Sequence, residues 1–424
     1  MNMKKSKLKC CLLTLSVTAA IVPAAVYADN QTDNQTDNLR QQVDDLQNQV
    51  DRLENTAAER NTDSSFHMAG YGSVEYADPD SGNAAFNKVL AAPIIHYNYQ
   101  DWLMFETEFE LSNTAEGGTE LALEYAAVNL FLNDYVALVA GKFLSPIGQF
   151  RQNLHPSWIN KAVSAPAGFG HGGAAPLSET GLQLRGGFPL GEMRANYAVY
   201  VGNGPTLAAG VEDDEGEYEL AIEEVETEGR TSDPDGKKSF GGRLGLLPFS
   251  GLEIGISAAK GKATVTDAFA GGHDGPELDI ESTGEFDYDV IGADFRYGWN
   301  NLELRGEYLK TEIGEGSAGV EFHSDDLPDG YAGPAEFDDV EVGQWKAWYL
   351  QAAYKIPSTS LETVVRTSEL QTPHSGENYS QRTLGLNYLF APHVIAKLNY
   401  EMKDYDSSGA DDEDTVRVQL AYGF

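Results

Sequence analysis

Charged side chains recur at every second position in parts of this chain, and that spacing could support polar chemistry. Glu106, Glu108 and Glu110 are separated only by Thr or Phe. Alternate residues of an extended segment share one face, so these carboxylates would form a negative row. Arg185 and Arg194 lie on the corresponding faces of later segments. If the two groups face each other across water, they create a transverse field that orients polar solutes.

A long connection between these groups carries further candidate residues. Its large apolar side chains, including Phe150, Trp158 and Phe169, could not all remain in water. We therefore expect residues 144–178 to fold inward onto a surface that buries them and to narrow the enclosed space. The alternative is that the wall charges simply pair with neighbouring residues and with the bases of this loop. The candidate loop residues are Arg151, His155 and Lys161, with His171 further along.

These residues do not predict an enzyme. His155 and His171 have no Ser or Cys near them in a setting that would make a nucleophile, and the two cysteines are Cys10 and Cys11. Nucleophilic catalysis needs such a combination of groups. Isolated histidines in loops are more often surface residues than metal ligands. We predict no catalytic residue, no metal site and no cofactor.

The elements that would position the charged rows are amphipathic strands, which recur from residue 66 to residue 424. In the last ten residues, one face carries Val416, Val418, Leu420, Tyr422 and Phe424. Lys or Arg in the middle of a membrane costs about 2–4 kcal/mol when it faces lipid, so the charged faces should line a wet interior. Seven short turns alternate with long polar connections. This pattern predicts an all-β fold, an antiparallel transmembrane β-barrel of about sixteen strands.

The expected strands follow from the alternation and the turn residues. They span residues 66–77, 88–99, 102–111, 120–132, 135–143, 179–188, 193–201, 239–247, 252–262, 286–297, 302–311, 345–356, 361–369, 380–390, 394–403 and 415–424.

The N-terminal region has a different character. A basic start, an apolar stretch and Val-Tyr-Ala at its end predict a signal peptide over residues 1–28. Residues 29–38 repeat Asp-Asn-Gln-Thr and should form a polar spacer. Residues 39–60 predict a short α-helical coiled coil, because apolar residues recur at spacings of four and three. Those residues are Leu39, Val43, Leu46, Val50, Leu53 and Ala57.

A helix this short is marginal alone in water, so self-association is expected. The heptad residues alone favour a dimer, whereas barrels of this size usually form trimers, and we predict a homotrimer. The alternative is a single amphipathic helix on the periplasmic mouth of the barrel.

The charge of the chain restricts its partners. The formal net charge is −37, which disfavours nucleic acid. Acidic residues concentrate in the long connections; residues 211–235 hold twelve Asp or Glu and one Arg. We expect these connections to lie outside the cell, where they keep the protein soluble and bridge through divalent cations to lipopolysaccharide. Outer-membrane lipid and lipopolysaccharide are therefore the expected surroundings.

The order of these features resembles the phosphate-selective porin superfamily of Gram-negative outer membranes. The motif that carries the resemblance runs from Gly141 to Phe150, Gly-Lys-Phe-Leu-Ser-Pro-Ile-Gly-Gln-Phe, and leads into the long loop. The terminal Phe424 also resembles the signal that the outer-membrane assembly machinery recognises. In that family, lumenal arginines and a lysine cluster select phosphate. Here the loop has only Arg151 and Lys161 as strong bases, which departs from the family pattern.

The resemblance implies passive diffusion of small hydrophilic solutes or ions through a water-filled channel in the outer membrane. The siderophore porins share the layout, so a siderophore or other substrate-specific receptor is the alternative function. A third possibility is an envelope tether whose coiled coil contacts peptidoglycan or a periplasmic partner.

Overall fold

The computed structural model describes residues 64–214, 217–270, 277–278, 280–282, 284–314, 320–322, 336–337, 340–373, 378–406 and 411–424. All of them belong to one compact unit. The predicted signal peptide, polar spacer and coiled coil lie outside the described residues.

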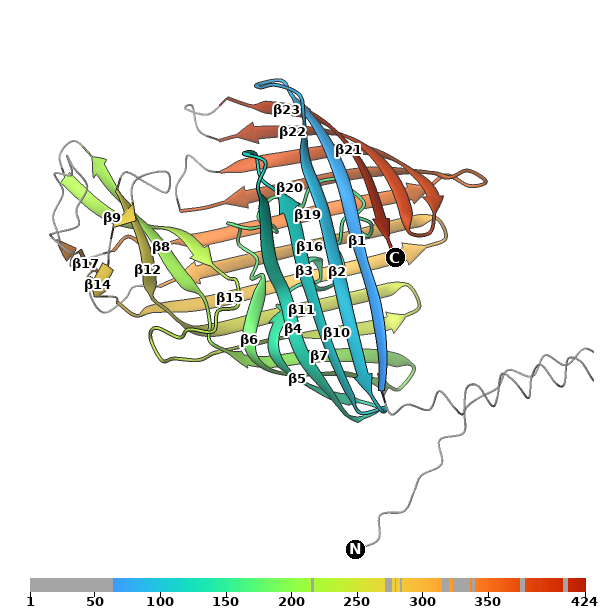
Figure 1. Ribbon diagram of the computed structural model, residues 1–424, viewed down its shortest axis with the longest axis horizontal. Helices are drawn as coiled ribbons and strands as arrows, with labels where there is room; N and C mark the ends of the chain where they lie inside the picture. The colour runs from blue at the N-terminus through green and yellow to red at the C-terminus, as the bar shows by residue number, and fades with distance from the viewer. Residues whose placement is uncertain are drawn as a thin grey trace, which may run out of the picture. The chain divides into compact units, whose positions relative to one another are not determined.

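Sixteen antiparallel strands close into a barrel (Figure 1). The barrel closes because β1 pairs with β2 on one side and with β23 on the other. This result confirms the predicted barrel, and the strand ends agree with the expected ones within a few residues. In order around the barrel, the strands are β1 (Ser64–Pro79), β2 (Ala85–Tyr99), β3 (Leu103–Asn113), β4 (Thr119–Asn133), β5 (Val136–Leu144), β6 (Ser178–Leu190), β7 (Met193–Gly202), β10 (Ser239–Phe249), β11 (Leu252–Ala263), β15 (Phe286–Trp299), β16 (Leu302–Ile313), β19 (Gln344–Lys355), β20 (Leu361–Gln371), β21 (Tyr379–Ala391), β22 (Val394–Tyr405) and β23 (Glu413–Gly423).

The alternation of residue types decides which side chains face inward. On β23, Val418 and Leu420 are 43% and 50% exposed on the outer face. Gln419 and Ala421, which alternate with them, are 3% and 0% exposed on the inner face. The outer face therefore presents apolar side chains, and the polar residues of the strand are enclosed.

The short turns are stabilised by residues in the left-handed region. Gln100, Asn300 and Ser358 have φ values of 51°, 51° and 63°, and Gly251 has 94°. Tight hairpin turns require positive φ, since this backbone twist matches that of the strands they join. All four residues fall in turns that the sequence predicted.

The long connections are more ordered than their composition suggested. They contain a four-stranded sheet in the order β13-β12-β8-β9 and a three-stranded sheet in the order β14-β17-β18. The sequence indicated polar connections at these places and did not predict the strands within them. The added strands are β8 (Thr206–Asp214), β9 (Glu217–Glu226), β12 (Val265–Ala270), β13 (Glu277–Leu278), β14 (Ile280–Ser282), β17 (Val320–Phe322) and β18 (Glu336–Phe337).

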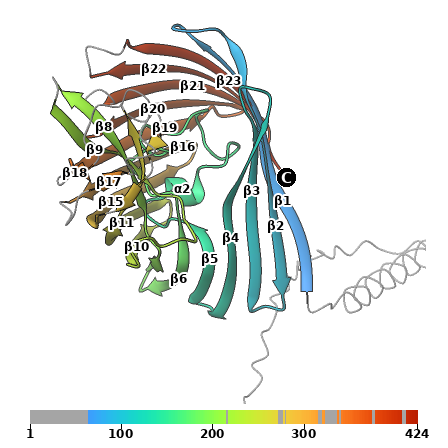
Figure 2. The same ribbon diagram turned by 60° about the vertical axis from the view of Figure 1, so that its left-hand side comes forward.

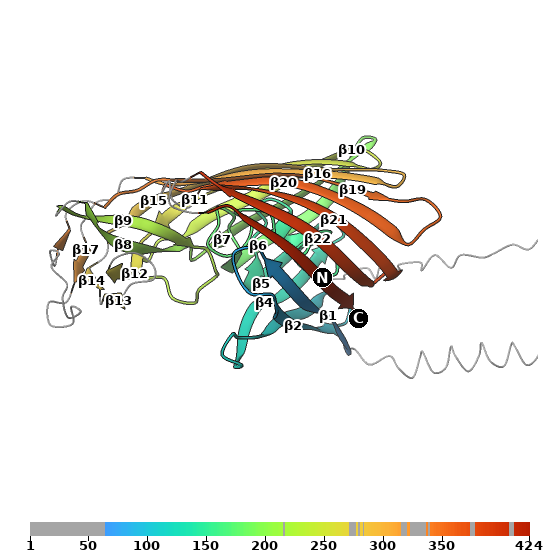
Figure 3. The ribbon, with the colours of Figure 1, turned by 90° about the horizontal axis from the view of Figure 1, so that it is seen from above.

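The physical reason is an apolar face among the acids. Leu207, Ala209 and Val211 alternate along β8 and are buried, as are Leu220 and Ile222 on β9. Figures 1 and 3 show these strands at the end of the barrel away from the C-terminus. On β9, Glu219 is exposed beside the buried Leu220, and Glu223, Glu224 and Glu226 are only partly buried, so the hairpin buries apolar side chains while these acids keep contact with water.

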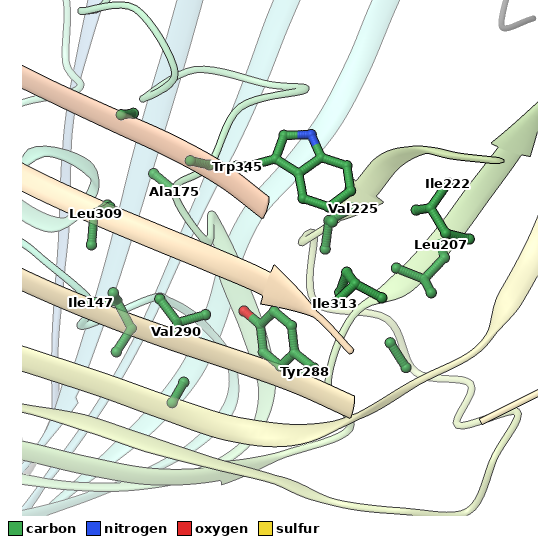
Figure 4. Packing of buried hydrophobic residues seen from close by; sticks show 14 of the residues in the cluster. Ile147, Ala175, Leu207, Ile222, Val225, Tyr288, Val290, Leu309, Ile313 and Trp345 are labelled. Carbon is green, nitrogen blue, oxygen red and sulfur yellow. The ribbon is translucent and has the colours of Figure 1, made fainter. Parts of the chain in front are cut away.

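The largest apolar cluster joins this sheet to the barrel wall. It includes Leu207, Ile222 and Val225 of the added sheet together with Ile313 and Trp345 of the wall (Figure 4). Burial of apolar surface stabilises the contact by about 25 cal/mol per Å². The added sheet is therefore a packed part of the fold.

Helix is scarce in the part of the chain that the structure describes. It is represented there by α2 (Phe150–Asn153), a single turn. No helix among these residues has both the length and the apolar character that a membrane crossing needs.

Candidate functional site

The connection between β5 and β6 makes polar contacts with inward-facing side chains of distant strands. Figure 2 shows α2, which belongs to this connection, within the ring of strands. The Gly148 N–H donates to Oγ of Ser257 on β11 (3.0 Å), and the Gln149 N–H donates to a carboxylate oxygen of Glu307 on β16 (2.9 Å). The Gln149 side-chain amide donates to Asp294 on β15 (2.8 Å). These bonds attach the first part of the loop to β11, β15 and β16, which lie four to six strands further around the barrel than β5.

Two buried cations hold the second part of the loop. Arg366 on β20 is 1% exposed and donates to the carbonyl oxygens of Ser164 (2.9 Å) and Ala165 (3.2 Å). Lys397 on β22 is also 1% exposed and donates to the carbonyl oxygen of Ala162 (3.0 Å) and to that of Ser157. We call Arg366 and Lys397 the anchor cations, because they satisfy loop carbonyls that would otherwise lack donors.

The predicted carboxylate row on β3 meets the first bases of the loop. Glu108 accepts a hydrogen bond from the Tyr71 hydroxyl (2.8 Å), and its Oε1 lies 3.5 Å from Nε2 of His155. The other ring nitrogen of His155 lies 2.6 Å from the carbonyl oxygen of Arg151. Arg151 itself forms an ion pair with Glu124 on β4. The structure thus brings Arg151 and His155 to the acidic part of the wall.

The other two members of the row also have basic neighbours. Glu106 accepts a hydrogen bond from the Asn129 side chain (2.9 Å) and lies 3.5 Å from Arg185. Arg185 in turn donates to Asn129 (2.8 Å). Glu110 lies 3.5 Å from Lys88 on β2. Glu106 and Arg185 therefore sit on one shared polar network, not on opposite walls.

Lys161 and Arg194 complete the predicted residues. The Lys161 ammonium donates to Glu362 on β20 (3.0 Å), and its carbonyl oxygen accepts from Asn387 on β21 (2.9 Å). Arg194 is exposed on β7, two residues before the inward-facing Asn196. Arg194 has no ion pair with any residue that the structure describes. These two bases are not brought together with Arg151 and His155 in one cluster.

A cavity of about 850 Å³ lies between the loop and the end of the barrel where the short turns are. The loop bounds it with Gln149, Leu154 and Trp158, and the turns bound it with Asn133 and Pro392. We call this cavity the lower chamber. Its basic residues are Lys161, Arg185, Arg243, Arg296 and Arg305, and its acidic residues are Asp134, Glu253 and Glu303.

The chamber arginines pair with carboxylates on neighbouring strands. Arg243 makes two hydrogen bonds to Asp294 (2.8 and 2.6 Å) and one to Glu253 (3.1 Å). Arg296 donates to Glu303 (3.0 Å), and Arg305 pairs with the same carboxylate. Sequence reasoning did not single out Arg296. The period of two that identified Glu106, Glu108 and Glu110 could have found it, because Asp294 and Arg296 alternate on β15.

A second cavity, of about 280 Å³, lies beside β9 and is lined by His171, Glu224 and Glu228. Nδ1 of His171 lies 2.9 Å from Glu228. This hydrogen bond raises the pKa of His171 above its ordinary value and lowers the pKa of Glu228. Among the described residues, no group of three or more His, Cys, Asp or Glu side chains is arranged to hold a metal ion.

Comparison with known proteins identifies the fold. No protein-family model and no curated protein matches the chain. Solved structures do match. A loop-deletion mutant of OmpT, an outer membrane protein of Vibrio cholerae, superposes with a TM-score of 0.53 at 11% identity, over 85% of this chain and 99% of the other. An anion-selective porin from Comamonas acidovorans gives 0.52 at 13% identity, over 85% and 100%.

A third similar structure is the outer membrane channel DcaP of Acinetobacter baumannii, with a TM-score of 0.50 at 11% identity, over 85% of this chain and 97% of the other. At such low identity these likenesses establish the fold alone. That fold is the sixteen-strand barrel of outer-membrane porins.

Proposed function

We propose that this protein is a porin of the Gram-negative outer membrane, through which small hydrophilic solutes or ions diffuse passively. The observation that carries the proposal is a closed barrel with an apolar outer face and a charged interior that contains a chamber of about 850 Å³. Only a closed barrel or helices can cross lipid with every backbone group satisfied. The porin fold of the similar structures supports the same function.

The inward loop and the wall charges would form the constriction. Arg151 and His155 face Glu108 and Glu124 on one side, whereas Lys161 lies near β20 and β21 on another. A passing solute would meet fixed charges of both signs within a narrow space, which favours polar over apolar solutes. The proposed constriction residues are Arg151, His155, Lys161, Glu106, Glu108, Glu110, Arg185 and Arg194.

We also propose a homotrimer that is exported by the N-terminal signal peptide and surrounded by outer-membrane lipid and lipopolysaccharide. The heptad pattern of residues 39–60 supports self-association and a contact with peptidoglycan or a periplasmic partner. Chemical cross-linking of the full chain in membranes would test the trimer. Deletion of residues 39–60 should reduce cross-linking between subunits if the coiled coil contributes.

Conductance in planar lipid bilayers tests the porin function. The folded protein should produce stepwise currents in potassium chloride, and a salt gradient should give a measurable reversal potential. Folded protein that inserts into the bilayer without any current would overturn the proposal.

A substrate-specific receptor, for example for a siderophore, is the second candidate. The apolar cluster between the loop, the added sheet and β15, β16 and β19 favours it, because packed side chains on that side of the interior leave less room for free diffusion. Tight ligand binding with little ionic conductance would favour this function over a general porin.

A further inference from the structure

The lower chamber has one basic side and one apolar side. The basic side comes from strands β6, β10, β15 and β16. The apolar side comes from β4, β21, β22 and the loop; it consists of Phe131, Leu154, Trp158, Ile159, Leu389 and Ile395. A space that passed only water and salt would have no use for so many apolar groups. Such a lining is typical of binding sites for small organic ligands, whose volumes are about 300–1,000 Å³.

The basic side contains a pair of arginines that shares one carboxylate. Arg296 and Arg305 are directly opposite each other in the register of β15 and β16. Like charges in that position repel, and the single carboxylate of Glu303 lies between them. The Arg296 side chain is 53% exposed in the lining of the chamber, so its guanidinium is free to donate further hydrogen bonds to an anion there.

The apolar side offers a surface for the rest of such a ligand. Phe131 is 41% exposed even though it lies two residues after the inward-facing Asn129 on β4. Leu389 follows Asn387 on the inner face of β21, and Asn387 donates to the carbonyl oxygen of Lys161. Lys161 lines the same chamber, so the basic and apolar sides meet there.

We propose that the lower chamber binds small monocarboxylates with an apolar body, such as aromatic carboxylates. The carboxylate would bind at Arg296 and Arg305, and the body would cover Phe131, Leu389 and Ile395. This inference names a substrate class for the channel and therefore rests on the porin function proposed above. A simple inorganic anion would satisfy the arginines but would leave the apolar side in water.

The test uses sodium benzoate as the probe and the full-length protein in planar bilayers and in calorimetry. Sodium acetate has the charge without the ring, and benzyl alcohol has the ring without the charge. Benzoate should reduce the ionic current in a saturable manner and should bind at least about tenfold more tightly than either control compound.

Two variants separate the two sides of the chamber. R296Q should weaken benzoate binding about tenfold, because it removes a charged hydrogen bond. F131A should weaken benzoate binding while leaving the weak response to acetate unchanged. The matched control is R382Q, since Arg382 is an exposed arginine paired with Asp404, outside the chamber lining, and it should bind benzoate like the wild type. If R296Q does not fold, the loss of benzoate binding in F131A still tests the inference.

Benzoate that binds no better than acetate, or equally well to the wild type and R296Q, would overturn the inference. A wild-type protein that conducts potassium chloride but ignores benzoate would refute this inference alone. Calorimetric binding of benzoate by a protein that conducts no salt would instead support the chamber site and refute the porin function.

Discussion

The interior wall contains two groups of basic residues that look alike in the sequence and differ in the structure. The anchor cations Arg366 and Lys397 are covered by the loop and donate to its carbonyl oxygens. Arg185 and Arg296 face the lower chamber, where their side chains are 37% and 53% exposed. Alternation places all four on the inner face. What distinguishes them is whether the loop or water covers that part of the wall.

The difference has an energetic consequence. A buried cation that is hydrogen-bonded to chain carbonyls leaves those oxygens without donors when it is removed. When an exposed arginine is removed, water takes over its hydrogen bonds, so the free energy of unfolding changes little. The anchor cations should therefore control the position of the loop, and the chamber arginines should control which ions pass.

The largest effect is expected for R366L. This substitution removes three donated hydrogen bonds to Ser164 and Ala165. A buried acceptor that is left without a donor costs about 1–3 kcal/mol, so the two carbonyl oxygens of Ser164 and Ala165 should together cost the loop about 3 kcal/mol of attachment. Hydrogen exchange of residues 157–170 should accelerate about 100-fold. R382L is the control, because Arg382 is exposed, and unchanged exchange in R366L would contradict the anchoring role.

A somewhat smaller effect is expected for G148A at the other attachment of the loop. Gly148 has φ of 72°, which costs another residue about 1–2 kcal/mol, and a Cβ there would collide with the Glu307 carboxylate. The midpoint of denaturant unfolding should fall, and single-channel conductance should become noisier as the loop loosens. G191A is a useful comparison, since Gly191 has φ of 65° but open space around it. Equal losses in the two variants would show that only backbone strain matters.

R185Q tests the chamber group. Because Arg185 is partly exposed, the free energy of unfolding should change by less than about 1 kcal/mol. The reversal potential in a potassium chloride gradient should nevertheless move toward cation preference, since one fixed positive charge near the conduction path is lost. A large loss of stability without a change in ion preference would erase the distinction between the two groups.

The smallest effect concerns the exposed pair of His171 and Glu228 beside β9. The pKa of His171 is raised by its hydrogen bond to Glu228. The contribution of the histidine to stability is therefore complete below pH 6.5 and is lost as pH rises through the higher pKa of the folded state. The pKa of Glu228 is lowered, so its contribution is present above pH 4.5 and is lost as pH falls through that lower pKa. The pair should therefore contribute between these two limits, by at most about 1 kcal/mol.

Nuclear magnetic resonance titration of His171 would measure this coupling. E228Q should return the pKa of His171 toward its ordinary value. An unchanged titration curve in E228Q would show that Glu228 is not the cause.

The barrel could be predicted from the sequence because its physical rule is local. A period of two, interrupted by turn residues, fixes both the strands and the inward face of residues such as Glu108 and Gln419. Which residue each charged side chain of the wall pairs with does not follow from the nearby sequence. The pairing of Glu108 with His155, and of Lys397 with loop carbonyls, depends on where one long loop comes to rest.

The added sheet shows a different limit. Residues 211–235 looked like a polar loop because twelve acids dominate the composition. The alternating Leu220 and Ile222 were present, but their burial requires an apolar surface from β15, β16 and the loop that no local pattern reveals. Arg296 needed no such information. The alternation rule places it on the inner face of β15 together with Asp294, but the rule was not applied to that strand.

Trp158 lies against the joint between the first and last strands. Tyr71 on β1 pairs with Gly423 on β23, and a Cβ on Gly423 would come within 2.8 Å of the Trp158 indole. The strand that closes the barrel, β23, is thus also a packing surface for the Trp158 indole of the inward loop. Because Trp158 also packs against the cluster that contains Tyr71, pairing of β1 with β23 completes the packing of its indole.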